Sequence, residues 1–131
     1  MFSGEANLIV AARKILQAGP KFVVVKKGEH GALLVSRENA GDSQPRICAL
    51  PAFPSAGAVD PTGAGDSFAG GMMGYLASAG RFDFRHLLRA MAYGTIVASF
   101  DIEDFGLRRY DRLSLEEIDA RLRQYHEMLE F

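Results

Sequence analysis

The sequence predicts an α/β fold in which a small sheet is packed against helices. The prediction depends on a segment with apolar residues at helical spacing, then short apolar runs typical of strands, then renewed helical spacing. A helix, a group of strands and a group of helices in this order are typical of a sheet covered by helices. In chain order, we expect helix 5–18, strands 22–25, 32–35 and 47–50, and helices 66–79, 84–100 and 114–129.

The boundaries of these elements come from the residues between them. Gly19-Pro20 ends the first helix, because proline cannot continue it. Residues 27–31 contain two glycines and predict a turn, and the polar residues 37–46 predict a loop or hairpin tip. Later features are a short strand at Ala58-Val59, an irregular connector at 101–110, and a capping box from Ser114 to Glu117 that opens the last helix.

The run Phe22-Val-Val-Val25 is apolar at every position, which is typical of a central strand covered on both faces. Such a strand needs neighbours, and the chain offers few strands to supply them. Either the sheet is small, or it is part of a larger sheet with one edge left open. An open edge would be paired or covered, for instance by a second copy in a homodimer.

Composition and charge exclude several classes of protein. The 131 residues predict a single domain, 1–131, and 48% of them are hydrophobic and 24% charged, as in ordinary globular proteins. The formal net charge of −1 gives no reason to expect nucleic acid or an anionic membrane as a partner. We find no secretory pattern and no apolar run near the ~20 residues of a membrane span. With Cys48 as the only cysteine, a cytoplasmic protein is the expectation.

The stretch Asp60-Pro-Thr-Gly-Ala-Gly-Asp66 is the strongest functional signal in the chain. It places Gly63, Ala64 and Gly65 at a helix entrance, where backbone N–H groups and the helix dipole favour an anion. Asp66 follows at once, so a carboxylate able to act as a base would lie beside the bound anion. An ordinary glycine-rich turn with an acidic helix cap is the competing interpretation. The stretch matches neither the P-loop nor the dinucleotide fingerprint.

Two segments together resemble the ribokinase-like (pfkB) carbohydrate kinases. The string Asp-Pro-Thr-Gly-Ala-Gly-Asp-Ser-Phe-Ala-Gly-Gly, residues 60–71, is similar to the C-terminal signature of that family. Upstream, Lys26-Lys-Gly-Glu-His-Gly31 resembles the family's turn of glycines beside the nucleotide phosphates. The resemblance covers nearly all of residues 5–129. It implies the C-terminal part of a ribokinase-like three-layer α/β/α fold.

The resemblance implies roles at the helix entrance. Asp66 would be the catalytic base that takes the proton from a sugar hydroxyl. Gly63, Ala64 and Gly65 would form an anion hole whose N–H groups stabilise charge on the transferring phosphoryl group, and the two glycines would also contact the nucleotide. Oriented amides next to a carboxylate are a plausible arrangement for this chemistry.

The resemblance also implies residues for the nucleotide and for ions. Gly28 and Gly31 would border the phosphates of ATP, with Lys26 beside them. Asp60 and Thr62 match positions that in some members help bind a monovalent cation such as K⁺. ATP and Mg²⁺ would be the cofactors.

Other polar residues have simpler interpretations. Consecutive side chains point in opposite directions, so at least one of Lys26 and Lys27 is expected to be a solvated lysine at the strand end. His30 is expected on the surface. The remaining charged clusters, all expected to be solvated, are Asp101, Glu103 and Asp104 in the connector, and Glu116, Glu117, Arg121 and Arg123 on the last helix.

The chain departs from the family pattern in three ways. The resemblance implies that family enzymes are roughly twice this length, so that this chain is the C-terminal, nucleotide-binding half, and that the missing half carries the sugar site and the lid. The family's Asn-x-x-Glu segment has no match, because Phe2 stands three residues before Glu5, so we expect that segment to precede Met1. Ala92 stands where many members place an asparagine near the adenine.

We therefore expect an ATP-dependent phosphotransferase that phosphorylates a hydroxymethyl group of a small sugar or nucleoside. For the chain alone we expect weak binding of ATP or phosphate and little or no kinase activity. Two alternatives stay open: a non-catalytic fragment that self-associates through an open sheet edge, and a kinase for a vitamin precursor such as a hydroxymethylpyrimidine.

Overall fold

The computed structural model describes residues 3–37, 46–54, 63–103 and 113–130. Its elements are α1 (Ser3–Gln17), β1 (Phe22–Lys26), the 3₁₀ turn η1 (Gly28–His30), β2 (Ala32–Ser36), β3 (Arg46–Leu50), α2 (Ala64–Ala79), α3 (Phe84–Asp101) and α4 (Leu115–Met128). Each helix and strand expected within these ranges is present, with ends that differ from the prediction by one or two residues. The expected strand at Ala58-Val59 lies outside the described residues.

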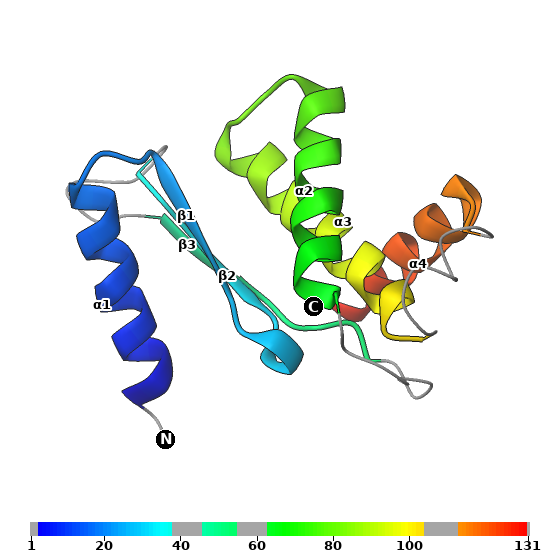
Figure 1. Ribbon diagram of the computed structural model, residues 1–131, viewed down its shortest axis with the longest axis horizontal. Helices are drawn as coiled ribbons and strands as arrows, with labels where there is room; N and C mark the ends of the chain where they lie inside the picture. Colours follow the sequence, from blue (N-terminus) through cyan, green and yellow to red (C-terminus); the bar gives the residue numbers. More distant parts are fainter. Residues whose placement is uncertain (1–2, 38–45, 55–62, 104–112, 131) are drawn as a thin grey trace.

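The elements form three layers, with α1 on one face of the sheet and α2, α3 and α4 on the other (Figure 1). The strand order is β1-β2-β3, and both pairs are antiparallel. Because successive side chains of a strand point to opposite faces, Val35 packs with Ala12 and Leu16 of α1, whereas Leu34 joins the larger core on the helical side. The predicted α/β/α architecture with a small sheet is therefore confirmed.

The central buried strand is β2, not β1. All five residues of β2 are buried, whereas the apolar residues of β1 are only half-buried. The prediction that Phe22–Val25 forms the central strand was therefore wrong for the described sheet, since the turn after β1 folds it into a hairpin with β2 alone. The prediction that both faces of this strand are covered is confirmed: Val23 and Val25 pack toward α1, and Phe22 and Val24 pack toward the larger core.

The larger core joins the sheet to the helical layer and fixes where α2 begins. The buried residues Phe68, Met72 and Leu76 of α2 pack with α3 and with Tyr125 of α4. Contacts between Gly94 and Phe68, and between Asp101 and Gly63, show that α2 and α3 run antiparallel. The first turn of α2 therefore lies beside the last turn of α3.

The last helix begins as the sequence predicts. The backbone N–H of Glu117 donates to the Ser114 hydroxyl at 3.2 Å, and the Glu117 carboxylate accepts from the Ser114 backbone N–H at 2.9 Å. These two bonds are the reciprocal pair of a capping box. Among the described helices, none is long and apolar enough to cross a membrane.

Candidate functional site

The N-terminus of α2 begins at a glycine in a left-handed conformation. Gly63 caps the helix with a φ of 82°, in the left-handed region that favours glycine, and the first bond of the helix runs from Ser67 N–H to the Gly63 carbonyl at 2.9 Å. The N–H groups of Ala64, Gly65 and Asp66 precede that bond and have no acceptor within the helix. They supply the donors and the partial positive charge that suit an anion.

The structure brings the two predicted phosphate segments together across 39 residues of sequence. Lys26, the last residue of β1, donates from Nζ to the carbonyl oxygen of Gly65 at 3.2 Å. An ammonium group thus lies at the first turn of α2, and it stays exposed. Lys27 is less exposed than Lys26 and is not among the residues that line the cavity described below.

The turn after Lys26 depends on Gly31. Its φ of 93° and ψ of −148° are open to glycine and strained for other residues, and its N–H donates to the Gly28 carbonyl. A Cβ at this position would overlap the Leu50 carbonyl oxygen and would lie 2.8 Å from Cα of Pro51. The hairpin turn therefore lies directly against the end of β3.

A cavity of about 310 Å³ lies between the hairpin turn and the two long helices. Its wall comes from the turn residues Gly28 and Gly31, from Phe53 after β3, from the first turns of α2, and from the last two turns of α3. Of the residues that line it, Lys26 and Glu29 carry charge, and most of the rest are small or apolar. The cavity therefore has a polar end at Lys26 and Gly65 and an apolar remainder.

The other predicted site residues divide into three groups. Asp66 is exposed in the first turn of α2 and follows Gly65 of the cavity wall, although it does not itself line the cavity. The His30 side chain is 76% exposed beside Glu29, as the surface interpretation predicts. Asp60 and Thr62 lie outside the described residues. Within the described part of the chain, no three His, Cys, Asp or Glu side chains come together as metal ligands would.

The acidic residues after α3 are not the solvated cluster that the sequence predicts. Asp101 is 2% exposed, and its Oδ2 would lie 3.4 Å from a Cβ placed on Gly63. Glu103 pairs with Arg121, and Asp104 lies outside the described residues. The prediction was wrong for Asp101 and Glu103, because α3 continues to Asp101 and carries it under the first turn of α2. The sequence signal was the unbroken helical pattern up to that residue.

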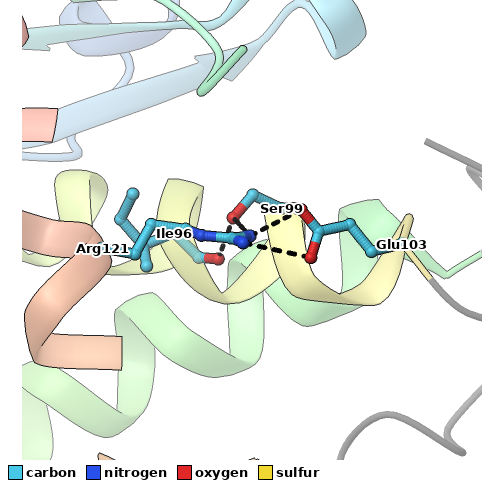
Figure 2. Close-up of polar contacts among 4 residues, drawn as sticks. All are labelled: Ile96, Ser99, Glu103 and Arg121. Carbon is cyan, nitrogen blue, oxygen red and sulfur yellow. Dashed lines mark hydrogen bonds and ion pairs between the residues drawn. The ribbon is translucent and has the colours of Figure 1, made fainter. Parts of the chain in front are cut away.

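Arg121 of α4 is also not the solvated residue that was expected. Its side chain is 18% exposed and forms an ion pair with Glu103, with 2.9 Å between Nη1 and Oε2. Nη1 also donates to the Ser99 hydroxyl at 3.0 Å, and that hydroxyl donates to the Ile96 carbonyl (Figure 2). The guanidinium lies 3.7 Å from the ring centroid of Phe100. Arg121 therefore ties α4 to the last turns of α3.

The segment that carries Phe53 is held from α4 by Tyr125. The Tyr125 hydroxyl donates to the Pro51 carbonyl, and the two rings of Phe53 and Tyr125 are 6.2 Å apart. Tyr125 is 1% exposed, and this burial raises the pKa of its hydroxyl to about 12. The neutral phenol is the form that can donate the bond to Pro51.

Replacing Tyr125 with Phe should change the alkaline stability of the protein. An unfolded tyrosine ionises near pH 10, about two units below the folded pKa, so the unfolded state loses its proton first as the pH rises. Between pH 8 and 11 the unfolding free energy of the wild type should therefore fall by about 1.4 kcal/mol more than that of Tyr125→Phe. Urea unfolding of both proteins from pH 8 to 11 measures this difference. Parallel pH profiles would contradict it.

These features define an α/β domain with a helix N-terminus and a glycine turn at one end of a cavity. Its family follows from comparison with known proteins. The sequence profile of the pfkB family of carbohydrate kinases matches residues 3–111, and the chain belongs to that family. Ribokinase from Thermotoga maritima is 32% identical, with a TM-score of 0.69 over 88% of this chain and 34% of that one. No curated protein sequence matches the chain significantly.

Two further solved structures show the same fold. Aminoimidazole riboside kinase from Salmonella enterica, in complex with aminoimidazole riboside and an ATP analog, is 25% identical, with a TM-score of 0.67 over 86% of this chain and 35% of that one. A fructokinase double mutant from Vibrio cholerae O395, in a form with fructose, ADP and potassium, is 23% identical, with a TM-score of 0.67 over 86% and 34%. The chain thus spans about a third of the length of these kinases, and not the half that was expected.

Proposed function

We propose that this chain is the nucleotide-binding part of an ATP-dependent kinase that phosphorylates a hydroxymethyl group of a small sugar or nucleoside. The observation that carries the proposal is the bond from Lys26 Nζ to the Gly65 carbonyl. It places a cation, a helix N-terminus and a turn with two glycines at one end of a cavity. A triphosphate needs this combination of charge and backbone donors.

The proposed roles follow from position. The N–H groups at Gly63, Ala64 and Gly65 would stabilise charge on the transferring phosphoryl group, because the first N–H groups of a helix have no acceptor within it. Asp66 would accept the proton of the attacking hydroxyl, since its exposed carboxylate follows directly in the same turn.

The proposed nucleotide site rests on residues that line the cavity, whereas the proposed ion sites rest on chemistry and on the family resemblance. Gly28 and Gly31 would border the ATP phosphates with Lys26, and all three line the cavity. Mg²⁺ would accompany the phosphates of ATP, because it is usually held by substrate phosphates and one or two carboxylates. Asp60 and Thr62 are proposed for K⁺ on the family resemblance alone.

Replacing Lys26 with Met should weaken phosphate binding without unfolding the protein. We expect the Kd for tripolyphosphate and for ATP to rise at least about tenfold, because a charge-assisted hydrogen bond contributes about 1.5–3 kcal/mol. Lys27→Met makes the same charge change one residue away, outside the cavity wall, and should alter both constants by less than about twofold at 0.15 M salt, where separated charges are screened. Isothermal titration calorimetry of the wild type and both variants measures this contrast.

The titrations separate three outcomes. Binding that Lys26→Met weakens and Lys27→Met preserves supports the phosphate site. Equal losses in both variants would indicate general attraction of an anion to a basic surface and would contradict the site. A wild type that binds neither ATP nor tripolyphosphate would overturn the proposed function.

The outer edge of β1 favours a second candidate function, a self-associating module without chemistry. Within the described sheet β1 pairs with β2 alone, so its other edge is open to a second copy. Size-exclusion chromatography at several protein concentrations, with and without ATP, tests this idea. A dimer that ATP neither strengthens nor dissociates, in a protein that also fails the titrations above, would favour the module over the kinase. The third possibility, a kinase for a vitamin precursor, is tested by offering a hydroxymethylpyrimidine as the acceptor in a phosphoryl-transfer assay.

A further inference from the structure

The apolar part of the cavity wall is held from behind by one side chain of α4. Phe53 and Ser99 both line the cavity, and Arg121 contacts both without lining it. The Arg121 guanidinium lies 5.0 Å from the ring centroid of Phe53 and donates to the Ser99 hydroxyl at 3.0 Å. One planar group therefore fixes the ring and the hydroxyl relative to each other.

The position of Arg121 is itself fixed on several sides. Glu103 accepts from Nη2 at 3.1 Å and pairs with Nη1, and the Phe100 ring lies 3.7 Å from the guanidinium carbon (Figure 2 shows the polar contacts). A flat guanidinium can stack on a ring and donate in its own plane at the same time, which an ammonium cannot do. The Phe53 ring is therefore held in place before any ligand arrives.

This part of the wall differs chemically from the phosphate end. Lys26 and Gly65 mark the polar end, whereas Phe53 and Ser99 lie in a stretch of wall with small and apolar neighbours such as Ala98. An aromatic ring held in place beside a buried hydroxyl suits a flat heteroaromatic group that stacks and donates one hydrogen bond, because the Ser99 hydroxyl already donates its own proton to the Ile96 carbonyl. A nucleobase joined to a polyphosphate has both of the groups that the two ends would take.

We infer that Arg121 is a positioning residue for the nucleobase, holding Phe53 and Ser99 in the wall that receives it. The inference rests on the proposed nucleotide site. It assigns a binding surface to the nucleobase, whereas Lys26 and Gly65 account only for the phosphates. Arg121 does not touch the ligand and acts through Phe53 and Ser99. If Arg121 is replaced, the protein should therefore bind ATP less tightly, while its affinity for tripolyphosphate, which has no nucleobase, should stay nearly the same.

The experiment compares the Kd for ATP with the Kd for tripolyphosphate in the full chain. We expect Arg121→Met to raise the Kd for ATP about tenfold and to leave that for tripolyphosphate within about twofold. Arg121→Lys keeps the charge without the planar group, and it should raise the Kd for ATP nearly as much as Arg121→Met does. Arg123→Met removes an equal charge from an exposed position of the same helix and should change neither constant.

Circular dichroism and urea unfolding establish that each variant is folded. If Arg121→Met does not fold, Glu103→Gln and Phe53→Leu allow the same comparison, because one releases the guanidinium and the other removes the ring. A merely structural role for Arg121 would weaken both ligands equally, since both need the same folded cavity.

Each outcome decides the inference. A selective loss of ATP affinity supports it. Folded variants with an unchanged ratio of the two constants, or a wild type that binds tripolyphosphate as tightly as ATP, would overturn it while leaving the phosphate site standing. A wild type that binds neither ligand would overturn the inference and the proposed function together.

Discussion

Gly31→Ala should destabilise the protein by about 3–5 kcal/mol, more than an ordinary surface substitution. Two effects add at this position. The backbone of Gly31 has a φ of 93°, which is strained for alanine. The added Cβ would also overlap the Leu50 carbonyl, which belongs to a paired strand and cannot move without disturbing β3. Urea unfolding monitored by circular dichroism measures the change in unfolding free energy.

Gly28→Ala is the matched control for this prediction. Gly28 belongs to the same turn and has a φ of 60°, but no atom lies within 4 Å of a Cβ placed on it. Its replacement should cost only the left-handed backbone strain, about 1–2 kcal/mol. Equal destabilisation by the two alanines would show that backbone conformation alone, and not contact with β3, makes Gly31 necessary.

The secondary structure could be predicted from the sequence because its signals are local. Apolar spacing, the Gly19-Pro20 stop and the capping box at Ser114 each act within a few residues, and all three lead to elements that the structure contains. The position of β1 in the sheet could not be predicted in this way. An apolar run at 22–25 indicates burial of both faces, but it carries no information about which edges are paired.

The site was predictable to the extent that it consists of motifs. The glycine turn and the helix entrance were both identified from sequence, and the structure joins them through Lys26 and Gly65. Arg121 and Asp101 were missed because their environment depends on how α3 packs on α2 and α4. Periodicity identifies the buried face of each helix, but it does not say which charged residue meets which neighbour across the interface.

Asp66→Asn should lower the rate of phosphoryl transfer by about 10²- to 10⁴-fold, the range expected when a general base is removed. The amide keeps the size of the carboxylate and cannot accept the proton of the attacking hydroxyl. The Kd for ATP should stay the same or fall, because the substitution removes a negative charge next to the proposed anion hole. Because little transfer is expected from the chain alone, the assays use a complete kinase that contains this segment. Single-turnover assays with that enzyme in excess over labelled ATP, and with ribose, fructose or adenosine as acceptor, measure both quantities.

Asp83→Asn is the control that separates loss of a base from loss of a negative charge at a helix start. Asp83 caps α3 by accepting from the His86 N–H at 2.9 Å, and asparagine can accept the same bond. This helix start lies at the far end of α3 from the cavity, since α2 and α3 are antiparallel and the last turns of α3 line the cavity wall. Asp83→Asn should therefore leave transfer unchanged. If Asp66→Asn transfers phosphate as fast as the wild type, Asp66 is not the base, and the helix entrance binds the nucleotide without supplying the acid–base chemistry.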